Sequence, residues 1–263
     1  METVTSADGT AIAYDRAGQG PALIVCNGAF CTRTAFVAPG DLARQFTVVT
    51  YDRRGRGDSG DVAATGPFTA EREYEDLAAV AAATGAGTPF LFGHSSGAAI
   101  ALRAAAAGLP VAGVVAYEAP FGNDDTPVPD VDPDARIREL VGAGRNREAV
   151  EFWMIDVVRV PHLTRAQLDG ADWVTALEPL ARTLPYDLAV TAGGVPEAEL
   201  AKIAVPVLIL GGGDSPAWFR RSVAEQAAAV PAARLRTLDG FGHNAPPEVL
   251  APILIDFLVG PQD

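Results

Sequence analysis

Several features are scarce in this chain of 263 residues, and each scarcity argues against a class of protein. Only two cysteines are present, Cys26 and Cys31, and their spacing matches no zinc or redox motif. No run of eighteen apolar residues occurs, so we expect no membrane span. Positive charge is also scarce, with 20 Lys and Arg residues against 33 Asp and Glu residues and a net charge of −13. Because such a charge repels phosphates, nucleic acid and anionic membrane surfaces are not expected as partners.

The amino-terminal segment lacks a basic stretch followed by an apolar one, which would mark a secretory signal. We therefore expect a cytoplasmic protein in which Cys26 and Cys31 form no disulfide. Lysine is also nearly absent, since Lys202 is the single one and the other basic residues are arginines. This usage, together with abundant alanine and glycine, suggests a bacterial source with a GC-rich genome.

The chain does contain alternating β-rich and helical segments. We expect a strand at residues 46–51, a strand, turn and helix at residues 89–109, and a buried strand at residues 111–121. The alternation resumes near the carboxyl end, with a strand in "VPVLILGGGD" and a helix over residues 218–230. A further strand and a last helix follow. This order predicts an α/β fold with a mostly parallel sheet and helices on both faces.

Residues 122–200 interrupt the alternation. Proline and aspartate cluster at their start in "NDDTPVPDVDPD", and only helical segments follow. We expect a helical cap here, inserted into a core formed by residues 1–121 and 201–263. Ligands of such folds bind at the carboxyl ends of the strands, so the loops that follow strands are the places to seek a site.

One such loop holds the sequence Gly93-His94-Ser95-Ser96-Gly97, which fits the motif G-x-S-x-G. The motif requires a strand before it and a helix after it, and both are expected here. Glycines permit the sharp turn, which raises the central Ser95 hydroxyl above the sheet as a nucleophile. The backbone N–H of Ser96 would lie at the helix amino terminus, where negative charge is stabilised.

A serine nucleophile needs a base, and the chain has three histidines. His243 is the predicted base, because it lies in the loop after the last strand and completes the order serine, acid, histidine. His94 is expected to point elsewhere, since neighbouring residues of a tight turn diverge. The acid that orients the imidazole has two candidates, Asp214 and Glu118, which each follow a strand. Spacing alone does not choose between them.

An oxyanion hole needs a second backbone N–H from a loop after an early strand. The segment "IVCNGAF" offers the amide of Ala29, with Phe30 next in the chain. Aromatic side chains could line an apolar substrate pocket beside this hole, although plain core packing is the alternative for each of them. The candidates are Phe30, Trp153, Trp173, Tyr186 and Trp218.

The segments "NGAF", "YDRRGRGDS", "GHSSG", "GGGD" and "GH" together resemble the α/β-hydrolase superfamily over nearly the whole chain. The resemblance implies an eight-stranded, mostly parallel sheet with a helical cap inserted after the sixth strand. It implies that Ser95 is the nucleophile and His243 the base, and that Ala29 and Ser96 form the oxyanion hole.

The same resemblance bears on the acid. Asp214 matches the usual family position after the seventh strand. Glu118 matches a position after the sixth strand, which some members use, as the fungal zearalenone lactone hydrolases do. Of the two, Asp214 is favoured. A departure from the family is Asn27, which stands where many members carry histidine.

The function implied is a serine hydrolase that cleaves an ester or lactone bond of a small, largely apolar molecule through an acyl-enzyme. This chemistry requires no metal or cofactor. The sequence does not decide between a monomer and a homodimer. Two alternatives remain: a member of the same fold with other chemistry, such as a perhydrolase, a carbon–carbon bond hydrolase or a lyase, or a ligand receptor without catalysis.

Overall fold

The computed structural model describes residues 1–61, 68–85 and 87–260. Its strands are β1 (Glu2–Thr5), β2 (Ala11–Gly18), β3 (Ala22–Cys26), β4 (Thr47–Tyr51), β5 (Phe90–His94), β6 (Gly113–Tyr117), β7 (Val207–Gly212) and β8 (Ala233–Leu238). They form an eight-stranded sheet in the order β1-β2-β4-β3-β5-β6-β7-β8. β2 pairs antiparallel with both β1 and β4, and every other neighbouring pair is parallel. The prediction of a mostly parallel, eight-stranded sheet is confirmed.

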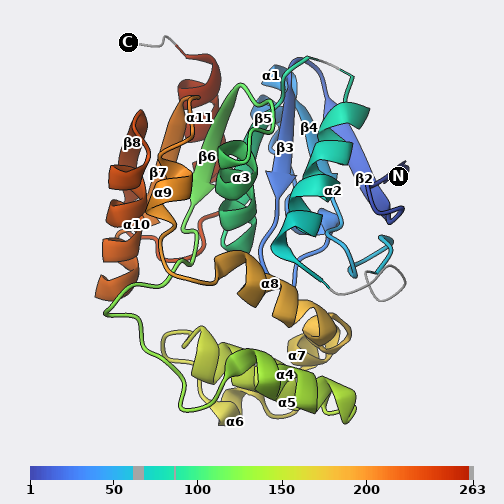
Figure 1. Ribbon diagram of the computed structural model, residues 1–263, viewed down its shortest axis with the longest axis vertical. Coiled ribbons are helices and arrows are strands. Elements are labelled where there is room, and N and C mark those ends of the chain that lie inside the picture. The colour runs from blue at the N-terminus through green and yellow to red at the C-terminus, as the bar shows by residue number, and fades with distance from the viewer. Residues whose placement is uncertain (62–67, 86, 261–263) are drawn as a thin grey trace.

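Helices cover both faces of this sheet (Figure 1). The helices flanking the sheet are α1 (Gly40–Gln45), α2 (Ala70–Ala83), α3 (Ser96–Ala106), α10 (Ala217–Ala229) and α11 (Pro247–Val259). Side chains of a strand alternate between faces, so Ile24 and Cys26 of β3 join the hydrophobic cluster of α2, α3 and α10. Leu23 and Val25 join the cluster of α1 and α11 on the opposite face. Burial on both faces explains why β3 is an unbroken apolar run.

The segment between β6 and β7 contains helices and, throughout residues 118–206, no strand. The α-helices of this segment are α4 (Pro133–Gly142), α5 (Asn146–Phe152), α6 (Arg165–Leu168), α7 (Asp172–Leu177), α8 (Leu184–Thr191) and α9 (Glu197–Leu200). A π-helical turn, η3 (Trp153–Val157), follows α5, and a 3₁₀ segment, η4 (Glu178–Thr183), precedes α8. α4 to α7 lie beyond the carboxyl ends of the parallel strands (Figure 1).

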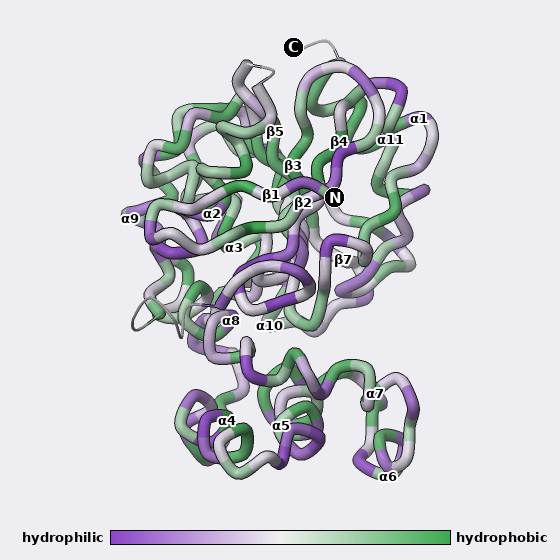
Figure 2. Tube along the Cα trace, turned by 90° about the vertical axis from the view of Figure 1, so that its right-hand side faces the viewer, coloured by the Kyte–Doolittle hydropathy of each residue, from purple (hydrophilic) through white to green (hydrophobic). Residues whose placement is uncertain are grey.

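Helices of the segment predicted as a cap share a hydrophobic cluster, which includes Ile137, Leu140 and Leu184. Figure 2 shows hydrophilic and hydrophobic stretches alternating along α4 and α5, as expected for amphipathic helices around a small core. Val190 of α8 and Leu200 of α9 instead belong to the large cluster on the sheet face that α2, α3 and α10 cover. The division into a core of residues 1–121 and 201–263 and a cap of residues 122–200 therefore stays a prediction.

In residues 1–61, 68–85 and 87–260, no helix is both long enough and apolar enough to cross a bilayer.

Candidate active site

The turn that joins β5 to α3 carries Ser95 in a strained backbone conformation. Its φ is 57° and its ψ is −131°, outside the regions that non-glycine residues usually adopt. A Cβ on Gly93 would come within 2.5 Å of Ala98 Cα, and one on Gly97 would collide with the Cys26 carbonyl oxygen. The turn therefore demands glycine at both positions, as the motif G-x-S-x-G requires. The strand before and the helix after it are confirmed.

His243 lies in the loop between β8 and α11 and contacts the carboxylate that follows β6. Its Nδ1 is 2.8 Å from Oε2 of Glu118. The other carboxylate oxygen, Oε1, accepts hydrogen bonds from the Gly212 N–H at 2.8 Å and from the Ser215 hydroxyl at 2.6 Å. Glu118 is fully buried and has a φ of 50°. Strain at a buried titratable residue is typical of functional sites.

These contacts fix the charge of Glu118 and the position of the hydrogen that it shares with His243. Burial would raise the pKa of Glu118, but hydrogen bonds from His243, Ser215 and Gly212 outweigh it and hold that pKa below its usual value. The carboxylate is therefore ionised at neutral pH and can only accept hydrogen bonds. It follows that His243 donates its Nδ1–H to Glu118, so Nε2 is the ring nitrogen available for proton transfer.

Of the two candidate acids, this geometry favours Glu118 over Asp214. The Asp214 side chain is exposed, and its backbone N–H bonds to the Phe241 carbonyl. The next residue, Ser215, is the one that turns inward and donates its hydroxyl to Glu118. The turn after β7 is where the family usually carries its acid. In this chain the end of β7 and that turn instead donate hydrogen bonds to Glu118, which follows β6.

Two residues that were not expected at the site hold the His243 loop. His94 Nε2 lies 2.7 Å from the His243 carbonyl oxygen, and the Tyr117 hydroxyl donates to the Gly242 carbonyl oxygen. The expectation that His94 points away from the site is wrong, since its ring centroid is 4.9 Å from that of His243. In the sequence, the one sign of this role is that His94 and Tyr117 lie at the carboxyl ends of β5 and β6.

The hydrogen bonds between described residues do not include one from the Ser95 hydroxyl to His243. Catalytic hydrogen bonds are often long before substrate binds and tighten only in the complex. The backbone does connect the two turns, because the Ser95 N–H donates to the Tyr117 carbonyl at 2.9 Å, next to Glu118.

The loop after β3 lies against the nucleophile. A Cβ on Gly28 would be 2.8 Å from Ser95 Cβ and 3.3 Å from Ser95 Oγ, so this loop approaches because it has glycine there. Ala29 and Phe30 follow and pack on the cap's hydrophobic cluster. The Phe30 ring makes an edge contact with Trp153, with centroids 6.4 Å apart. Phe30 and Trp153 are thus brought together beside the predicted oxyanion donor.

The other aromatic candidates take different places. Trp173 on α7 is 47% exposed, and its place in an apolar pocket stays a prediction. The Tyr186 ring stacks on Phe68 and its hydroxyl donates to Asp61 at 2.8 Å, and its place in a substrate pocket stays a prediction. Trp218 stacks on Phe219, whose ring centroid lies 5.4 Å from that of His243. Trp218 therefore stays a prediction.

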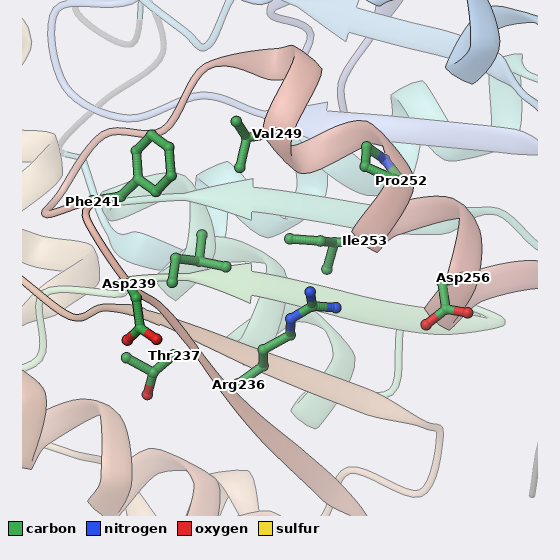
Figure 3. A pocket seen from close by; sticks show the side chains of 9 residues that line it. Arg236, Thr237, Asp239, Phe241, Val249, Pro252, Ile253 and Asp256 are labelled. Carbon is green, nitrogen blue, oxygen red and sulfur yellow. The ribbon is translucent and has the colours of Figure 1, made fainter.

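Two further observations bear on ligands. A hollow of about 660 Å³ lies between β8 and α11 (Figure 3). Its lining includes Phe241 but not Ser95, Glu118 or His243, and it mixes acidic, basic and apolar groups. In the part of the chain that the structure describes, no group of three or more His, Cys, Asp or Glu side chains is arranged to hold a metal ion.

Comparison with known proteins agrees with this fold. The profile of the alpha/beta hydrolase family matches residues 23–252. This chain belongs to that family. The crystal structure of an alpha/beta hydrolase from Sphaerobacter thermophilus DSM 20745 is similar, with 44% sequence identity and a TM-score of 0.88. The match covers 97% of this hydrolase and 99% of that chain.

Two more distant structures share the fold. An esterase from Rhodococcus sp. ECU1013 has 20% identity and a TM-score of 0.72, over 98% of each chain. The enol-lactonase from Burkholderia xenovorans LB400 has 22% identity and a TM-score of 0.70, over 98% of this hydrolase and 99% of that chain. Among curated proteins no match is found.

The environment of His94 predicts a pH-dependent stability. Burial, followed by the nearby His243, lowers the pKa of His94 to about 4. An unfolded histidine has a pKa of about 6.5, so between these values the unfolded chain binds more protons than the folded one. The free energy of unfolding should therefore fall as pH drops from 7 to 5, with about 1–2 kcal/mol of that fall due to His94.

Urea denaturation at pH 7 and pH 5 measures this contribution. In the variant His94→Gln, whose amide can still donate to the His243 carbonyl, the fall should be smaller by that amount. The matched control is His162→Gln, at an exposed position of the cap, and it should keep the wild-type pH dependence. An unchanged fall in His94→Gln would show that His94 does not titrate as described.

Proposed function

We propose that this hydrolase cleaves ester or lactone bonds of small, largely apolar molecules through an acyl-enzyme on Ser95. The observation that carries the proposal is the 2.8 Å contact between His243 Nδ1 and the buried Glu118 carboxylate, beside the strained Ser95 turn. The chain order serine, acid, histidine and the contact between the acid and the histidine match those of a serine, histidine and acid triad, which supports the proposal. The esterase and lactonase neighbours in the fold support it.

In the first half of the reaction, the Ser95 oxygen attacks the substrate carbonyl carbon and its proton moves to Nε2 of His243. The imidazolium that forms is stabilised by the ionised Glu118 through the Nδ1 hydrogen bond. The carbonyl oxygen becomes an oxyanion, which the backbone N–H groups of Ala29 and Ser96 would bind. The Ser96 N–H is available because the first N–H groups of a helix have no partner within the helix.

In the second half, the tetrahedral intermediate collapses and His243 returns its proton to the departing alkoxide. For a lactone the alcohol stays attached to the acyl group. Water then attacks the acyl-enzyme while His243 takes its proton, and a second collapse releases the carboxylic acid and restores the Ser95 hydroxyl. Removal of one oxyanion donor typically costs about 3 kcal/mol of transition-state stabilisation.

The apolar character proposed for the substrate rests on Phe30 and Trp153. The two rings meet next to Ala29, and both belong to the hydrophobic cluster of the cap. An acyl group bound at Ala29 would lie beside these rings, where burial of apolar surface is favourable.

The assignment of the triad is tested by three variants. Ser95→Ala should abolish hydrolysis of p-nitrophenyl butyrate while it leaves the circular dichroism spectrum unchanged. Glu118→Gln should lower kcat by about 10³- to 10⁴-fold, because an amide no longer stabilises the correct imidazole tautomer or the imidazolium. Steady-state kinetics and the rate of labelling by a fluorophosphonate measure both effects.

Asp214→Asn is the matched control and should keep wild-type kinetics, since the Asp214 side chain is exposed. Full esterase activity in Ser95→Ala would contradict the proposed function. A loss of labelling in Asp214→Asn, with normal labelling in Glu118→Gln, would instead show that Asp214 is the acid.

The two cap tryptophans offer a matched pair for the substrate pocket. Trp153→Leu should raise KM for p-nitrophenyl butyrate by about 10-fold with little change in kcat, because uniform binding of an apolar group is lost. Trp173→Leu should leave both constants unchanged, since Trp173 is 47% exposed. Equal effects of the two changes, or a preference of the wild type for anionic esters, would contradict the apolar pocket.

A further inference from the structure

We propose that Asp187 of cap helix α8 is a positioning residue that holds the two oxyanion-hole residues, Ala29 and Ser96, in their working geometry. The inference rests on the proposed function. Asp187 is distant in sequence from both residues and is reached through two separate hydrogen-bond paths.

The first path runs through Arg56 to the loop after β3. Arg56 Nη2 donates to Asp187 Oδ2 at 2.7 Å, and Arg56 Nη1 donates to the Gly28 carbonyl oxygen at 2.7 Å. The Gly28 carbonyl and the Ala29 N–H belong to one planar, trans peptide, so they point in opposite directions. By holding the carbonyl, Arg56 fixes the direction of the Ala29 N–H.

The second path leads to the residue after the nucleophile. The Ser96 hydroxyl donates to Asp187 Oδ1 at 2.6 Å and accepts a hydrogen bond from Arg53 Nη1 at 3.0 Å. Arg53 Nη1 also donates to Asp187 Oδ1 at 2.7 Å. The side chain of Ser96 is thereby locked, and with it the first turn of α3 that presents the Ser96 N–H. One oxygen of the Asp187 carboxylate thus bonds to Arg56, which holds the Gly28 carbonyl, and the other bonds to the Ser96 hydroxyl.

The cluster of Asp187, Arg53 and Arg56 is buried, and its charges are paired with one another. Asp187, Arg53 and Arg56 are each at most 1% exposed. Burial would raise the pKa of Asp187, but the charges of Arg56 and Arg53 outweigh it and hold that pKa below its usual value. Thr183, just before α8, also accepts a hydrogen bond from Arg56 Nε at 3.2 Å. The position of Thr183 and of the start of α8 is therefore coupled, through Arg56, to the geometry of the oxyanion hole.

The chain offers a control of the same kind. Asp76 on α2 is also fully buried and is bonded to a buried arginine, with Oδ2 2.7 Å from Arg54 Nε and Oδ1 2.6 Å from Arg54 Nη2. Arg54 lies in the same arginine-rich segment as Arg53 and Arg56, but it donates its other hydrogen bonds to Asp8 and to the Arg72 carbonyl, not to the Gly28 loop or Ser96. Asp187→Asn and Asp76→Asn therefore each replace a buried carboxyl group that is bonded to a buried arginine.

The experiment compares these variants at equal concentrations of folded protein. Asp187→Asn should lower kcat for p-nitrophenyl butyrate by about 10²-fold, as expected when a catalytic group is misplaced, while KM changes little. Asp76→Asn should lose stability and keep kcat. Should Asp187→Asn fail to fold, Arg56→Lys and Arg54→Lys form a second pair, because lysine cannot reproduce the fork that Arg56 makes.

Inhibitor binding separates positioning from a merely structural role. A butyl trifluoromethyl ketone adds the Ser95 oxygen to its carbonyl carbon, with the proton passing to His243, and leaves an oxyanion in the hole. Its affinity should fall in parallel with kcat/KM in Asp187→Asn, whereas the corresponding carbinol, which cannot add, should bind as to the wild type.

Equal losses for ketone and carbinol, or a wild-type kcat in Asp187→Asn, would overturn the role of Asp187. That result differs from failure of the proposed function, which would appear in the wild type itself as absence of Ser95 labelling by a fluorophosphonate.

Discussion

The hydrogen-bonded burial of the Glu118 carboxylate is the constraint on which the rest of the site depends. A buried charge is costly unless it is paired, and three donors satisfy this one: the Gly212 N–H, the Ser215 hydroxyl and His243 Nδ1. These donors come from the end of β7, the turn after it and the loop after β8. The carboxylate therefore ties together three strand ends that only the parallel sheet brings close, and it offsets the strain of a φ of 50°.

A second group of buried charges links the cap to this centre. Replacing buried ion pairs by apolar side chains is often neutral or stabilising, so such pairs are weak arguments for stability alone. Here Asp187 bridges Arg56 and Arg53, reaches the loop after β3 through Arg56, and accepts a hydrogen bond directly from Ser96 at the start of α3. Directional bonds between cap and core give a fixed geometry that apolar contacts would not define.

Much of this molecule could be predicted from the sequence because it depends on local pattern. Alternating segments predicted the sheet, and the glycine spacing placed Ser95 on its turn. The helix α1 and the strand β1 were not predicted, since both are short and carry no strong periodicity. The choice of acid depended on which side chain of the turn after β7 points inward, and that is Ser215 rather than Asp214. Asp187 carried no signal, because a single aspartate on a cap helix reveals its partners only in three dimensions.

The central claim is that the carboxylate of Glu118, which follows β6, orients the imidazole of His243, and proton NMR tests it most directly. At low temperature and neutral pH, the wild type should show a strongly downfield, slowly exchanging Nδ1–H resonance from a histidine bonded to a carboxylate. The resonance should persist in Asp214→Asn and in His94→Gln and disappear in Glu118→Gln. Its survival in Glu118→Gln, together with its loss in Asp214→Asn, would contradict the account.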